Sequence, residues 1–168
     1  MNQESKELYN IDNSDVIKHV IFSLVNVSRP KTSSDYAWAI IKDLLNELNH
    51  SYSFLKYIVI DEIESLNDTI DDIDISLKIN SVAPIEIGKA IQSFIDIYKI
   101  KMGTKAGYFF IQEFKEDLGI NYNSIIKEMG VDLRLIELKE ELSGISSQEI
   151  RIKDDVNSNI AFIEKKDL

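Results

Sequence analysis

Residues 84–119 read PIEIGKAIQSFIDIYKIKMGTKAGYFFIQEFKEDLG, and they carry the clearest pattern in the chain. On both sides of Gly103, apolar side chains recur at the i, i+3, i+4 spacing of a helix with one apolar face. Pro84 suits the first turn of a helix, while Gly103 and Gly119 suit the two helix ends. We therefore expect two antiparallel helices that touch each other and on which the rest of the chain packs.

Aromatic side chains are concentrated near the start of the second helix of this pair. Gly107 lies beside them and would let two helix backbones approach closely. Aromatic residues at helical spacing most often fill a core, but they also line ligand pockets and two-fold interfaces. The candidate ligand or interface residues are Tyr108, Phe109, Phe110 and Phe114.

The composition is typical of a globular domain that is stable without disulfide bonds. Of 168 residues, 44% are hydrophobic, and there are six glycines, two prolines and no cysteine. The lack of cysteine excludes disulfides, thiol catalysis and thiolate zinc sites. No apolar run is long enough to span a bilayer and no signal-peptide pattern is present, so we expect a cytoplasmic protein.

The charge balance is strongly acidic. The chain has 29 Asp and Glu residues against 19 Lys and Arg residues, which gives a net charge of −10. Such a surface repels phosphate backbones and anionic membranes, and no dense basic cluster offsets it. We therefore expect neither nucleic acid nor a membrane as a partner.

The N-terminal part is expected to form a loose arm followed by a helix. Residues 1–11 are polar and mixed in charge, which is typical of an unattached end. A helix can begin at Asn13 or Ser14, either of which can cap it. The β-branched run from Val20 to Val27 also fits a strand.

Two more helices are expected on either side of the central pair. The apolar residues from Ala37 to Leu48 repeat with helical spacing, and Ser33 or Ser34 would cap that helix. A short helix with a cap at Asn121 should stop at Gly130.

Two hairpins complete the expected fold. Residues 54–63 are dense in β-branched side chains and residues 73–79 alternate apolar with polar ones, so these two runs should pair as antiparallel strands. Residues 149–162 have the pattern of a second hairpin, whereas residues 131–142 fit both helix and strand, with their charged residues favouring helix. The expected class is α+β, with helices packed on an antiparallel sheet built from two hairpins, in a single domain over residues 12–168.

Lysines near the turn between the paired helices suggest an anion site. Lys101, Thr104 and Lys105 precede a helix start, where backbone N–H groups can hold an anion. The glycine and lysine spacing of a P-loop is absent. Residues 29–34 form a similar basic segment before another helix. An ordinary capped helix start is the simpler interpretation of both segments.

Carboxylates are dense in the first hairpin. They are Asp61, Glu62, Glu64, Asp68, Asp71, Asp72 and Asp74. Their spacing does not match a calcium loop of the EF-hand type, and the turn glycine of that loop is missing. We therefore expect no metal and no cofactor, and we interpret the carboxylates as a charged hairpin edge that could dock a basic protein partner. His19 and His50, the only histidines, are too few for a zinc site on their own.

No catalytic motif emerges from the sequence. No serine lies in a nucleophile-elbow setting. Paired carboxylates are so common in an acidic chain that their presence does not indicate an active site. We expect a non-enzymatic interaction or regulatory domain that forms a homo-oligomer, such as a two-fold dimer, through apolar helices. The alternatives are a small-molecule sensor with an aromatic-lined pocket, a winged-helix DNA binder, which the charge opposes, and an enzyme acting on a phosphorylated substrate.

Overall fold

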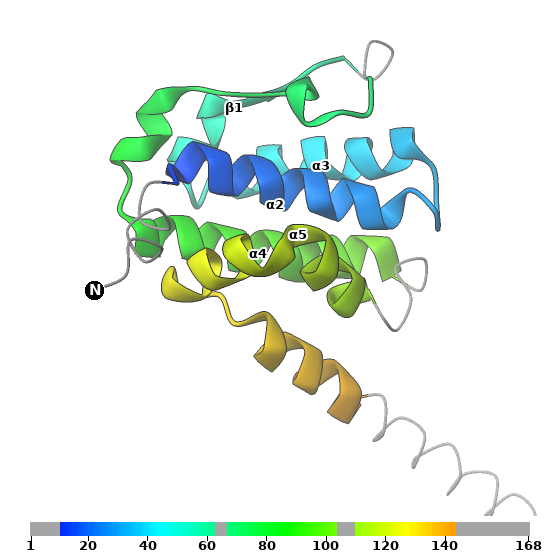
Figure 1. Ribbon diagram of the computed structural model, residues 1–168. Coiled ribbons are helices and arrows are strands. Elements are labelled where there is room, and N and C mark those ends of the chain that lie inside the picture. The colour runs from blue at the N-terminus through cyan, green and yellow to red at the C-terminus, as the bar shows by residue number, and fades with distance from the viewer. Residues whose placement is uncertain (1–10, 63–66, 104–109, 144–168) are drawn as a thin grey trace, which may run out of the picture. The chain divides into compact units, whose positions relative to one another are not determined.

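The computed structural model describes residues 11–62, 67–103 and 110–143, and the chain forms two compact units. The first unit ends at Leu133 and the second begins at Arg134. In the described part of the first unit, four α-helices run alternately in opposite directions, and a small hairpin is inserted between the second and the third (Figure 1). The structure is mostly helical with a two-stranded antiparallel sheet, which is compatible with the α+β class.

The elements of the first unit have the following bounds. The helices are α2 (Asn13–Ser28), α3 (Ser34–Leu48), α4 (Pro84–Met102) and α5 (Phe110–Glu128). The strands are β1 (Ile58–Ile60) and β2 (Ile73–Ile75). The 3-10 helices beside them are η2 (Ser53–Tyr57), η4 (Ile70–Asp72) and η5 (Leu77–Ser81).

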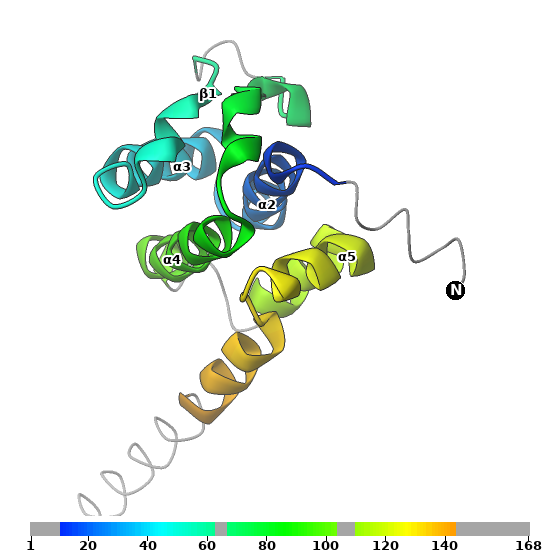
Figure 2. The same ribbon diagram turned by 90° about the vertical axis from the view of Figure 1, so that its left-hand side faces the viewer.

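Helix α2 is the centre of the first unit. It packs on α3, α4, α5 and η5, and Figure 2 shows it among the other helices. A helix that is apolar on most sides must be buried on most sides, so the β-branched run that also fitted a strand belongs to a core helix. Its buried apolar residues are Val16, Ile17, Val20, Ile21, Leu24, Val25 and Val27.

The two helices of residues 84–119 touch, as predicted, where Tyr98 of α4 stacks on Phe110 of α5. Each of them, however, packs mainly on another helix, so they do not form the central pair that we expected. Helix α4 lies mainly against α3, and α5 lies mainly against α2. Asn26 Nδ2 of α2 donates a 2.8 Å hydrogen bond to Asp117 Oδ1 of α5. The close approach occurs at Gly88, where a Cβ atom would lie 1.9 Å from the carbonyl oxygen of Met129. Gly107, for which we predicted this role, lies outside the described residues.

The first hairpin is confirmed, but it is shorter than predicted. Strands β1 and β2 are antiparallel, with Ile58 opposite Ile75 and Ile60 opposite Ile73. The predicted alternation breaks down after β2, where Leu77 is 74% exposed and Ile79 is fully buried. The cause is the turn into η5, because a 3-10 helix has a period of three residues instead of two.

The described residues do not form the broad, helix-covered sheet that we predicted. Their sheet has two strands, and the helices pack mostly on one another. The second hairpin, predicted for residues 149–162, lies outside the described residues, as do residues 1–10 of the predicted arm. The predicted single domain over residues 12–168 stays a prediction.

Several predicted helix ends are confirmed. Pro84 begins α4, and Gly103 follows its last residue with a φ of 52°. The Ser33 hydroxyl accepts a 3.2 Å hydrogen bond from the Tyr36 amide at the start of α3. Gly119 interrupts α5 with a φ of 78°, a value that favours glycine.

Residues 133–143 are helical, which agrees with the preferred interpretation of residues 131–142. Gly130, with a φ of 98°, ends the preceding helix, and the Val131 amide donates to the Ile126 carbonyl at 2.8 Å. This is the bond of a Schellman motif, which stops one helix before the next begins. Most of helix 133–143 belongs to the second unit.

Candidate functional site

The described aromatic candidates lie in the core. Phe110 and Phe114 of α5 are 1% and 0% exposed. The Phe110 ring stacks on Tyr98 with 5.9 Å between ring centroids. Tyr108 and Phe109 lie outside the described residues. The two described rings therefore stabilise the packing, and a ligand or interface role for the set stays a prediction.

Lys101, the described member of the candidate anion site, is engaged with another helix. Its Nζ lies 3.1 Å from the Glu47 carboxylate, so it joins α4 to α3. Thr104 and Lys105 lie outside the described residues. An anion at this position would compete with Glu47 for the lysine, because both offer it negatively charged oxygens.

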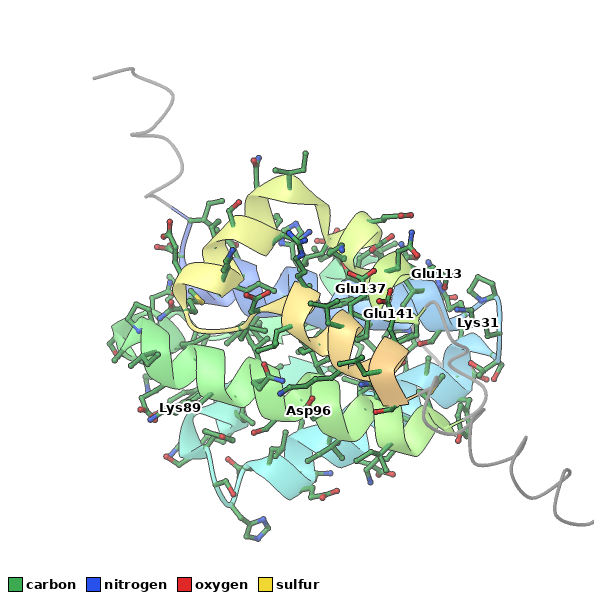
Figure 3. The ribbon with its side chains drawn as sticks, turned by 90° about the horizontal axis from the view of Figure 1, so that it is seen from below. Lys31, Lys89, Asp96, Glu113, Glu137 and Glu141 are labelled. Atoms are coloured by element: carbon green, nitrogen blue, oxygen red, sulfur yellow. The ribbon has the colours of Figure 1, made fainter. Side chains whose placement is uncertain are left out.

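The basic segment before α3 contacts acidic groups from other parts of the first unit. Lys31 forms an ion pair with Glu113 of α5, and the two side chains lie close together in Figure 3. Arg29 Nη1 lies 3.8 Å from the Asp68 carboxylate. Both cations therefore have a structural use, which supports the simpler interpretation of residues 29–34.

Asp68 is the hub of a polar cluster that sequence reasoning missed. Its Oδ1 accepts a 3.0 Å hydrogen bond from the indole of the fully buried Trp38 and a second bond from the Ser34 hydroxyl. The Ser34 bond lowers the pKa of Asp68, partial desolvation opposes this, and the Trp38 bond and the charge of Arg29 lower the pKa further. The cluster fastens the hairpin loop to the start of α3.

Asp72 lies in the same loop and is 2% exposed. Its carboxylate accepts hydrogen bonds from the amides of Thr69 at 2.8 Å and of Asn67 at 3.1 and 3.2 Å. The Thr69–Asp72 pair forms a capping box around η4. The sequence contained the signal, a threonine followed three residues later by an acid, but no apolar helical run followed to draw attention to it.

The dense carboxylates of the hairpin therefore divide into two groups. Asp68 and Asp72 bind groups of the chain itself, whereas Asp61, Asp71 and Asp74 are exposed. In the described ranges, no three His, Cys, Asp or Glu side chains are grouped so that they could hold a metal ion. The docking of a basic protein on the exposed carboxylates stays a prediction.

The two histidines have structural contacts. His19 stacks on Tyr122 of α5 with 4.0 Å between ring centroids, and its Nδ1 lies 2.8 Å from the Asp15 carbonyl oxygen. His50 Nδ1 lies 3.3 Å from the Glu47 carbonyl oxygen at the end of α3. The His19 contact links α2 to α5.

Tyr98 places a hydroxyl inside the core. Its side chain is fully buried, and the hydroxyl donates to Ser28 Oγ at 2.8 Å, while Ser28 Oγ donates to the Leu24 carbonyl at 2.7 Å. Burial raises the pKa of Tyr98 to about 12, although the Ser28 bond lowers it in part. This relay joins α4 to the last turn of α2.

Replacing Tyr98 with phenylalanine should lower the free energy of unfolding by about 1–2 kcal/mol at neutral pH, because Ser28 loses its buried donor. The phenol of the unfolded chain has a pKa of about 10. The folded pKa is about 12, so the contribution of Tyr98 to the free energy of unfolding should be fully present below pH 10. It should then fall by up to about 1.4 kcal/mol per pH unit between pH 10 and pH 12.

Urea unfolding at several pH values would measure this effect. The Tyr98→Phe variant should lose less stability than the wild type between pH 10 and pH 12, the interval set by the two pKa values. The other tyrosines are common to both proteins and cancel in the difference. If the free energies of unfolding of the two proteins fell equally with pH, a raised pKa for Tyr98 would be contradicted.

A small cavity lies between α2, α4 and η2. The space open to the centre of a water-sized sphere is about 10 Å³, which is close to the minimum for one water molecule. None of its lining side chains is polar, and one of them is aromatic, so the cavity gives a small-molecule sensor no support. The lining residues are Ile17, Val20, Ile21, Leu55, Ile58, Ala90, Ile91 and Phe94.

The helix of residues 133–143 carries a row of exposed leucines. Leu135, Leu138 and Leu142 are 51%, 45% and 64% exposed. Their i, i+3, i+7 spacing places them on one face of the helix. We call these three residues the leucine face. The sequence reveals the spacing, but not the exposure.

Comparison with known proteins does not assign these features to a family. No family model matches the chain, and no curated protein or solved structure matches it either.

No helix in the described ranges is both long enough and apolar enough to cross a membrane.

Proposed function

We propose that this protein is a non-enzymatic interaction domain that associates with a second copy of itself. The observation that carries the proposal is the leucine face on residues 133–143, where each leucine is between 45% and 64% exposed. Large apolar side chains aligned on one helix face are typical of a surface that is covered in an assembly.

The polar groups of the first unit support a non-enzymatic role. Arg29, Lys31 and Lys101 each contact a carboxylate of another element, and Asp68 and Asp72 accept bonds from neighbouring loop and helix groups. A catalytic site needs groups that converge on a substrate, whereas these groups converge on one another.

The position of the surface differs from the position that the sequence suggested. Phe110 and Phe114 are buried, so these two rings offer little area to a partner. The apolar side chains of α4 that follow its helical stripe are buried as well, from Ile87 to Met102. The exposed Ile85 and Ile100 of α4 are 15 residues apart and form no row. We therefore assign self-association to the leucine face of residues 133–143.

Sedimentation velocity of the full chain across the micromolar range would test the proposal. The mass of one chain is 19.3 kDa. We expect the weight-average mass to rise towards twice that value as the concentration increases, and to return on dilution. A mass that stays at one chain throughout that range would contradict self-association.

A further inference from the structure

We propose that two copies of the chain pair through the leucine face in antiparallel orientation, about a two-fold axis at Leu138. This inference rests on the proposed self-association and specifies its surface and geometry. The leucines follow the a and d spacing of a heptad, with Leu135 three residues before Leu138 and Leu142 four residues after it. The axis then places Leu138 against its own copy and Leu135 beside Leu142 of the second copy.

The charges beside the leucine face favour this orientation. At about 100° per residue, Arg134 and Glu141 lie on the same flank of the face, and Lys139 lies on the other. Antiparallel helices bring like flanks together, so each Arg134 approaches Glu141 of the second copy. A parallel pair instead brings opposite flanks together and places Arg134 near the basic Lys139 of the second copy.

The antiparallel arrangement has one unfavourable contact. Lys139 approaches Lys139 of the second copy on the other flank. The two-fold axis produces the attraction between Arg134 and Glu141 twice and this repulsion once, and exposed pairs of either sign have similar strength. The surface therefore complements itself, which identifies the occupant as a second copy of this chain.

Reversal of the flanking charges would test the pairing. In the full chain, Arg134→Glu and Glu141→Arg should each weaken the dimer about threefold to tenfold, and the double reversal should restore it. The two residues are seven positions and about 10 Å apart along one helix, so we expect restoration by the double reversal to come from a contact between copies. Glu140→Arg, opposite the leucine face, is the matched control (Figure 3 shows its neighbours Glu137 and Glu141).

Leu138→Glu should abolish the dimer in the same sedimentation assay. The net charge of −10 repels the second copy at low salt, so the assay should be run at about 0.15 M ionic strength, where the Debye length is about 8 Å. Circular dichroism would confirm that each variant keeps its helix content. A variant that loses helix is replaced by Leu138→Gln, which keeps the chain uncharged at that position.

Cysteine cross-linking would test the orientation independently, because the chain has no cysteine of its own. A mixture of a Leu135→Cys chain and a tagged Leu142→Cys chain should give mostly mixed disulfide dimers if the pair is antiparallel. Disulfides between identical variants would instead indicate a parallel pair and overturn the inference.

The outcomes separate this inference from the function on which it rests. A wild-type chain that stays monomeric removes both. A dimer that persists in Leu138→Glu overturns the inference but keeps self-association at another surface. Single reversals that weaken the dimer without restoration in the double variant exclude the antiparallel geometry.

Discussion

Replacing Gly88 with alanine is expected to destabilise the first unit by about 3 kcal/mol or more, beyond the usual range for overpacking. In an exposed helix the same change would stabilise by about 1 kcal/mol, because alanine is the better helix former. At Gly88, the added Cβ would lie 1.9 Å from the carbonyl oxygen and 2.7 Å from the carbonyl carbon of Met129. These are backbone atoms, so the clash cannot be relieved by the rotation of a side chain.

Chemical denaturation of Gly88→Ala beside the wild type would measure the loss. Gly119→Ala is a useful control, because nothing lies within 4 Å of its added Cβ but its φ of 78° strains any other residue. It should cost about 1–3 kcal/mol from backbone strain alone, because a φ of 78° with a ψ of 166° is a conformation essentially restricted to glycine. If Gly88→Ala proved as stable as the wild type, α4 could not approach Met129 as closely as described.

Replacing Asp72 with alanine should cost about 2–3 kcal/mol, the second largest expected loss. The carboxylate is 2% exposed and accepts hydrogen bonds from the Thr69 and Asn67 amides. Its removal leaves two part-buried amides without this acceptor, and each such donor costs about 1–3 kcal/mol unless water reaches it. The loop that carries Asp68 should loosen at the same time, since Thr69 lies next to it.

Thermal and urea unfolding would measure this change, with Asp71→Ala as the neighbouring control. Asp71 is exposed, so its removal should alter the free energy of unfolding by no more than about 0.5 kcal/mol. The difference between the two variants isolates the hydrogen bonds of the buried Asp72 carboxylate from the general effect of removing one negative charge. Equal losses in the two variants would show that Asp72 does not hold the loop.

Local patterns predicted the elements correctly where the decisive interactions are local. The cap at Ser33, the first-turn proline at Pro84 and the break at Gly119 depend on residues close in sequence. The pairing of β1 with β2 also followed, because their apolar residues are separated by one loop. The helix at residues 133–143 was favoured by its charged residues, which are common in exposed helices.

Contacts between distant segments could not be predicted from these patterns. An apolar stripe shows that a helix is covered but not which helix covers it, so the pairing of α4 with α3 and of α5 with α2 was missed. Gly88 looked like an ordinary helical residue, because its neighbour Met129 lies far away in the sequence. The same limit applies to the candidate site, where the partner of Lys101 is the distant Glu47.

The central place of α2 has a consequence for synthesis of the chain. This apolar helix leaves the ribosome early, whereas α5, its main neighbour, is made much later: Asn26 and its partner Asp117 are 91 residues apart. At about 5–20 residues per second, the nascent helix waits roughly 5–18 s for that cover. During this interval its apolar faces are accessible to chaperones and to other nascent chains. Slow translation between the two helices would therefore raise the risk of aggregation.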